Sequence, residues 1–232
     1  EIISGIKDEE SFKLRKSILK KIIISRIKID LILPELKVHN AFGFNLDNSE
    51  ISEKIGNIIR LIELTKDFES LIKTINIKLL DDGWDFIKQY DENANIGFKN
   101  SMFQYLPKSD IKNLIQQFKS RWTLDNLNYL KVKVVEYYAT ILVNNFSVQE
   151  KRSIQEIILS YDNSIDIYLL ATALYVDNKI SFKNTPGKND YMDLNHLTYL
   201  NGQLNQIVTN DKMLHRIMSK IYPENILKTN EI

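Results

Sequence analysis

Cysteine is absent from this sequence, which excludes disulfides, zinc sites built on thiolates and thiol nucleophiles. Histidine occurs only three times, at His39, His196 and His215, and this is too few and too scattered for a zinc motif. Acidic and basic residues nearly cancel, with 31 Lys and Arg against 30 Asp and Glu. The net charge therefore does not indicate nucleic-acid binding, and any nucleic-acid site must be a local patch of basic residues.

Glycine and proline are also scarce, with 7 and 4 residues in a chain of 232, so we expect long elements and few loops. Long apolar runs are lacking too. The longest, such as residues 22–24 and 31–33, are too short to span a membrane, and nothing resembles a secretory signal. The sequence therefore predicts a cytoplasmic, globular protein that is long enough to bury a substantial core and has no membrane partner.

Hydrophobic periodicity in the first part of the chain predicts a helix from Glu9 to about Arg26, followed by a strand. The other face of this helix is basic, carrying Lys13, Arg15, Lys16, Lys20, Lys21 and Arg26. Such a face can bind phosphates, although a solvated amphipathic helix explains it at least as well. The apolar run Leu31–Leu33, stopped by Pro34, is typical of a buried parallel strand.

The middle of the chain has an almost wholly helical pattern. It predicts one helical stretch from Ser49 to Thr74 and further helices at Asp81–Tyr90, Ser109–Trp122 and Thr123–Phe146. A capping box at Ser147–Glu150 is expected to start a helix that runs to about Tyr161, with another from Asn163 to Val176.

The last part predicts a helix that opens at Asp190, a strand at Gln206–Val208, a helix at Asp211–Lys220 and an edge strand at Asn225–Leu227. A strand, a long crossover and then strand, helix and strand favour a small parallel sheet flanked by helices. The expected fold class is therefore α/β, helix-rich overall.

Three aspartates carry the predicted chemistry. Asp190 and Asp193 lie three residues apart on one helical face, and Asp211 follows the carboxyl end of a strand, where parallel sheets bind ligands. Clustered carboxylates select hard cations such as Mg²⁺ or Mn²⁺, which activate water for phosphodiester hydrolysis. The alternative is that each aspartate caps or precedes a helix.

The segments Asp193–Leu200 and Gln206–Lys212 together resemble the end of PIN-like nuclease domains. The resemblance implies a PIN-like core over residues 1–45 and 147–232, with residues 46–146 as a helical insertion. It further implies a metal-dependent endoribonuclease, of a toxin or defence type, that cleaves RNA or, less favoured, DNA. Asp193 and Asp211 would be catalytic, and Asp190, Asp193 and Asp211 would hold Mg²⁺ or Mn²⁺.

Two acids of the family pattern lack clear counterparts. The first would precede Glu1, outside the sequence given, and for the second only Glu35, directly after Pro34, is present. A non-catalytic PIN-like scaffold or protein-interaction module, with its partner on the helical insertion, is therefore an alternative. An all-helical regulatory domain without a sheet is a third.

Overall fold

The computed structural model describes residues 6–25, 30–47, 49–78, 93, 96, 124–145, 151–181, 187, 190–200 and 205–228. The chain divides into two compact units. The first combines residues 1–33 and 47–96, and the second combines residues 34–46 and 97–232. No helix within the described ranges has the length and apolar character that crossing a bilayer requires.

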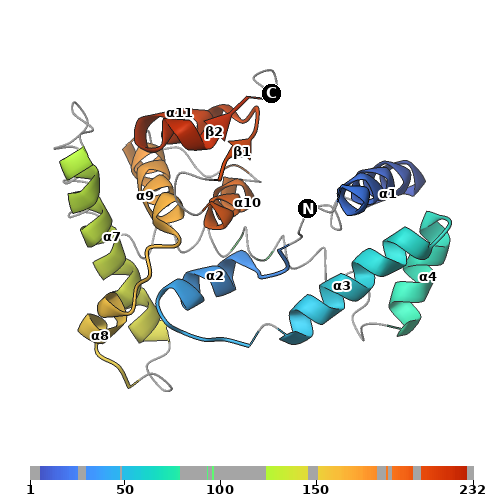
Figure 1. The fold of residues 1–232 in the computed structure, drawn as a ribbon, viewed down its shortest axis with the longest axis horizontal. Helices are drawn as coiled ribbons and strands as arrows, with labels where there is room; N and C mark the ends of the chain where they lie inside the picture. Colours follow the sequence, from blue (N-terminus) through green and yellow to red (C-terminus); the bar gives the residue numbers. More distant parts are fainter. Residues whose placement is uncertain are drawn as a thin grey trace. The chain divides into compact units, whose positions relative to one another are not determined.

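The first unit contains α1 (Glu9–Ile24), α3 (Ser49–Leu64) and α4 (Phe68–Lys78), all shown in Figure 1. Apolar side chains from the three helices and the segment before α1 form one buried cluster, which consists of Ile6, Phe12, Leu19, Ile58, Ile62, Leu71 and Ile75. The predicted first helix is thus confirmed as far as Ile24.

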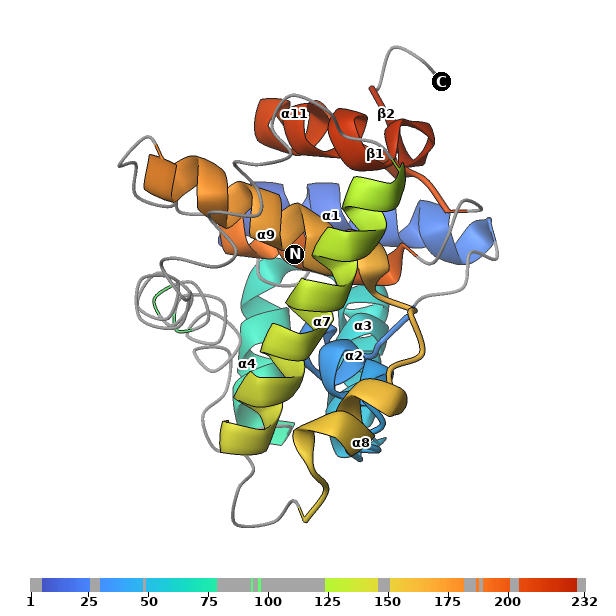
Figure 2. The same cartoon turned by 90° about the vertical axis from the view of Figure 1, so that its left-hand side faces the viewer.

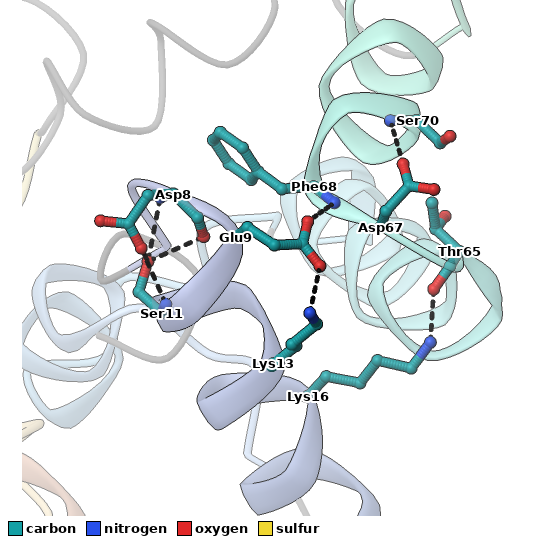
Figure 3. Close-up of polar contacts among 9 residues, drawn as sticks. All are labelled: Asp8, Glu9, Ser11, Lys13, Lys16, Thr65, Asp67, Phe68 and Ser70. Carbon is teal, nitrogen blue, oxygen red and sulfur yellow. Dashed lines mark hydrogen bonds and ion pairs between the residues drawn. The ribbon is translucent and has the colours of Figure 1, made fainter.

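Polar contacts fix the start of α1 against the turn between α3 and α4 (Figure 3). The Glu9 carboxylate accepts the backbone N–H of Phe68 at 2.8 Å, and the Lys16 ammonium donates to the Thr65 carbonyl. Asp67 accepts the N–H of Ser70 at 2.9 Å and so caps α4. This cap explains why the predicted stretch Ser49–Thr74 forms two helices.

The second unit is built around α9 (Asp166–Ser181), whose residues 167–176 are all buried. A helix that is apolar on every side must be covered on every side. Accordingly α9 packs against α7 (Leu124–Asn145), α10 (Asp190–Asn195) and α11 (Lys212–Ile221). Figure 2 shows α7 crossing α9, with α11 alongside. The unit also contains α2 (Pro34–Ala41), α8 (Ile154–Leu159), and the 3₁₀ turns η1 (His196–Tyr199) and η3 (Pro223–Asn225).

Two short strands near the end of the chain form the sheet of the described residues. β1 (Ile207–Val208) pairs in parallel with β2 (Ile226–Leu227), and α11 connects them. The buried side chains of α11 follow helical spacing, at Leu214, Ile217, Met218 and Ile221. The predicted strand, helix and strand are therefore present.

The predicted fold class is nevertheless wrong. The described residues are predominantly helical and contain a sheet of two strands with two residues each, not a PIN-like α/β sheet flanked by helices. Leu31–Leu33 form no strand. The Asp30 carboxylate accepts the N–H of Ile32 at 3.0 Å, which turns the chain, and Pro34 begins α2. Proline suits a first helical position because the N–H it lacks has no partner inside the helix.

Several predicted features fall outside the part of the chain that the structure describes. The helices predicted at Asp81–Tyr90 and Ser109–Trp122, and the capping box at Ser147, lie outside the described residues. The structure has a capping box at Ser153 and Glu156, whose side chains bond each other's backbone N–H groups at the start of α8.

Gly43 follows α2 with a φ of 77°, a conformation that costs other L-residues about 1–2 kcal/mol. A Cβ there would also lie 3.0 Å from Ser160 Cβ. We expect Gly43→Ala to lower the free energy of unfolding by about 2 kcal/mol, as measured by chemical denaturation. Gly56→Ala in α3 is the matched control. Among the described residues its Cβ would meet Leu31 Cδ1, at an ordinary contact distance of 3.9 Å, so this change should be neutral or stabilising.

Candidate functional site

Asp190, the first residue of α10, is engaged by protein donors. Its Oδ2 accepts hydrogen bonds from the Tyr175 hydroxyl and, at 2.7 Å, from the Gly187 N–H. The Lys179 ammonium lies 3.0 Å from the same oxygen, and the side chains of this ion pair are each 19% exposed. The Lys179 ammonium is therefore a cation already present at this carboxylate. Lys179 lies one turn after Tyr175 on α9.

The protonation states of this group favour a fixed ion pair. Burial alone would raise the pKa of Asp190, but the bonds from Tyr175, Gly187 and Lys179 outweigh it, and its pKa is lowered. Burial, together with the bond to Asp190, raises the pKa of the Tyr175 hydroxyl well above its usual range. At neutral pH the carboxylate stays charged and the phenol stays a donor.

Asp211 is the N-cap of α11. Its Oδ1 accepts the N–H of Leu214 at 2.7 Å, and its own N–H donates to Thr209 Oγ1 at 3.1 Å. His215 Nε2 lies 2.6 Å from the Thr209 carbonyl oxygen, to which it must donate because a carbonyl only accepts. The Thr-x-Asp sequence thus forms a capped helix start that follows β1.

Asp193 lies half-buried on α10, one turn after Asp190. Among the described residues, no three histidine, aspartate or glutamate side chains are grouped in a way that could hold a metal ion. Asp190, Asp193 and Asp211 all belong to the described residues, and they do not form such a group. The Asp190 carboxylate is instead paired with Lys179, and the Asp211 carboxylate caps α11.

Asp166, which the sequence did not single out, has the same kind of surroundings as Asp190. It is the first residue of α9, and it accepts from the Tyr161 hydroxyl at 2.7 Å and pairs with Lys131 of α7 at 3.0 Å. A carboxylate at a helix start, bound by one tyrosine and one lysine, thus occurs twice among the described residues of this unit. Lys131 is 35 residues before Asp166, so no short motif marks the contact.

Glu35, the candidate for the second family acid, lies in the first turn of α2. It accepts a hydrogen bond from the Tyr191 hydroxyl at 2.8 Å, which ties α2 to α10. Burial and then the negative charge of Glu35 raise the pKa of Tyr191. Glu35 thus bonds the residue next to Asp190, and the contact joins two helices.

Comparison of the chain with protein-family models, curated proteins and solved structures finds no match. Functional inference therefore depends on the geometry of the chain itself. That geometry assigns Asp190 and Asp211 to helix starts, each with protein donors on its carboxylate.

Proposed function

We propose that this protein is a non-catalytic interaction module, in which the acidic residues of the second unit hold helices in place. The observation that carries the proposal is the ion pair of Asp190 with Lys179, at 3.0 Å. A divalent ion at Asp190 would have to displace this ammonium or lie close to it, and like charges repel strongly in a partly buried site.

The metal-dependent RNA nuclease stays a prediction. It requires Asp193 and Asp211 to share an ion, and Asp211 has a structural use already as the N-cap of α11. A metal ligand and an N-cap tolerate different substitutions. Asparagine caps a helix about as well as aspartate, whereas alanine does not, but neither replaces a carboxylate bound to Mg²⁺ or Mn²⁺.

Two substitutions at Asp211 therefore distinguish a metal ligand from a residue that only caps α11. If Asp211 only caps α11, Asp211→Asn should leave the free energy of unfolding nearly unchanged, and Asp211→Ala should lower it by about 1 kcal/mol. Chemical denaturation with and without Mn²⁺ measures both. A stabilisation by Mn²⁺ that disappears in both variants would instead indicate a metal ligand.

Titration with Mn²⁺, followed by calorimetry, and a cleavage assay on single-stranded RNA complete the test. The non-catalytic proposal expects no saturable binding and no cleavage by the wild-type chain. Cleavage that requires Mn²⁺ and is lost in Asp193→Asn and Asp211→Asn would overturn it and support the nuclease.

A further inference from the structure

The side of α1 that faces away from the core of the first unit combines positive charge with exposed aliphatic groups. We call this the outer face of α1 and define it by six exposed residues, Lys13, Leu14, Ser17, Lys20, Lys21 and Ile24. Phe12 and Leu19, on the opposite side of the helix, are buried. The outer face is therefore not needed to form the core.

The structure separates the four lysines of α1 into two groups. Lys16 is directed inward, where its ammonium donates to the Thr65 carbonyl (Figure 3). The same ammonium lies 5.5 Å from the centre of the Phe12 ring. Lys13 stays 71% exposed, although it pairs with Glu9 at 3.2 Å. Lys20 and Lys21 are both exposed.

Positive charge dominates the outer face towards the end of the helix. The acids of α1 are Glu9 and Glu10, both in its first turn, whereas Lys20 and Lys21 lie in its last two turns. Glu10 is exposed beside Lys13 and Leu14, so it weakens the positive potential only at the beginning of the face. The end of the face therefore has charge complementarity for an anionic partner.

The aliphatic residues define the kind of anion. Leu14 is 58% exposed and Ile24 is 69% exposed, on the same side of the helix as the lysines. Aliphatic side chains are not stabilised by contact with phosphate groups, and the outer face has no aromatic ring on which a base could stack. These residues therefore do not favour a nucleic acid as the partner. A membrane-surface helix inserts a continuous apolar face, but the apolar face of α1 is buried against α3 and α4.

We propose that the outer face of α1 docks an acidic, amphipathic helix of a partner protein. Glutamates or aspartates of the partner pair with Lys20 and Lys21, while its aliphatic side chains cover Leu14 and Ile24. This inference rests on the proposed function as an interaction module and names the class of partner. Because several residues on both sides take part, the interaction should weaken with added salt but not vanish.

The probe is a fluorescein-labelled helical peptide that repeats leucine and glutamate at helical spacing, with the same peptide carrying glutamine as its control. Fluorescence anisotropy with the full chain should show saturable binding of the glutamate peptide. The double variant Lys20→Glu, Lys21→Glu should weaken this binding about tenfold or more. Leu14→Ser, Ile24→Ser should weaken it several-fold. Lys220→Glu, an exposed change on α11, is the matched control and should have no effect.

Three outcomes would overturn this proposal. The glutamate peptide fails to bind, or it binds equally well to the Lys20→Glu, Lys21→Glu variant. The third is that oligouridine or phosphatidylserine vesicles bind through these lysines while the peptide does not, which would assign the face to phosphate groups. None of these measurements involves Mn²⁺ or cleavage. If the peptide does not bind, the proposal of a non-catalytic module is therefore not contradicted. If the chain cleaves RNA with Mn²⁺, the peptide-binding result can still be interpreted.

Discussion

Leu19→Ala is expected to lower the free energy of unfolding of the first unit by about 3 kcal/mol, whereas Leu14→Ala should change it by less than about 0.5 kcal/mol. Both leucines lie on α1, and the same atoms are removed. Leu19 is 2% exposed within the cluster formed with α3 and α4, and Leu14 is 58% exposed. Only Leu19→Ala leaves a cavity whose lining loses its contacts.

Hydrogen exchange, read by mass spectrometry, tests this pair because it reports each helix separately. Leu19→Ala should speed exchange of amide protons in α1, α3 and α4, because these helices share one buried cluster. Equal effects of the two substitutions would contradict the assignment of the inner and outer faces of α1. That result would also remove the basis for the docking surface.

Asp190→Asn is expected to destabilise the second unit by about 2 kcal/mol at neutral pH, because it removes the negative charge that pairs with the Lys179 ammonium in a largely buried ion pair. The ion pair joins α9 to α10, and the Tyr175 hydroxyl also bonds Asp190. Lys179→Met should have a smaller effect, since it leaves Asp190 with the Tyr175 and Gly187 donors. A double-mutant cycle measures the coupling of the pair.

The effect of Asp190→Asn should depend on pH in a defined direction. The pKa of Asp190 is lowered from the 3.8 of an unperturbed aspartate. The contribution of the Asp190 carboxylate to the free energy of unfolding is therefore complete above the pKa of the unfolded state, near 3.8. This contribution is lost as the pH falls through the lower pKa of the folded state. Urea denaturation at several pH values should show wild type and variant converging in acid. Asp125→Asn, an exposed change on α7, serves as the control. A difference independent of pH would show that the charge of Asp190 contributes nothing.

Sequence periodicity located the helices that bury one face. The apolar spacing of α1 and α11 predicts both helices to within two residues at each end. The segments that became β1 and β2 were also predicted, because each is a short apolar run beside a helix boundary. These features depend on near neighbours in the chain, which the sequence records directly.

The error in fold class came from the resemblance to PIN-like domains and from one run of three apolar residues that was interpreted as a strand of the same sheet. Leu31–Leu33 has the composition of a buried strand, and Pro34 was interpreted as its end. In the structure the Asp30 carboxylate bonds the N–H of Ile32, and the proline starts α2. Composition cannot distinguish a strand from a turn of this kind, because the difference lies in the partner of one backbone N–H group.

The surroundings of the candidate aspartates were predictable only in part. The capping of α11 by Asp211 was an explicit alternative, since its position before a helical pattern indicates a cap. The ion pair of Asp190 with Lys179 depends on how α9 and α10 pack, and nothing in the local sequence specifies that packing. A row of carboxylates alone therefore supports metal binding and helix anchoring equally.

Two ion pairs, one near each end of α9, restrict how this helix can move. Asp166, at its beginning, is bound to Lys131 of α7, and Lys179, in its last turn, is bound to Asp190 of α10. A shear motion that shifted α9 along its own axis by one turn would break both pairs at once. Rearrangements within this unit should therefore turn the surrounding helices about α9 and leave its axial position unchanged.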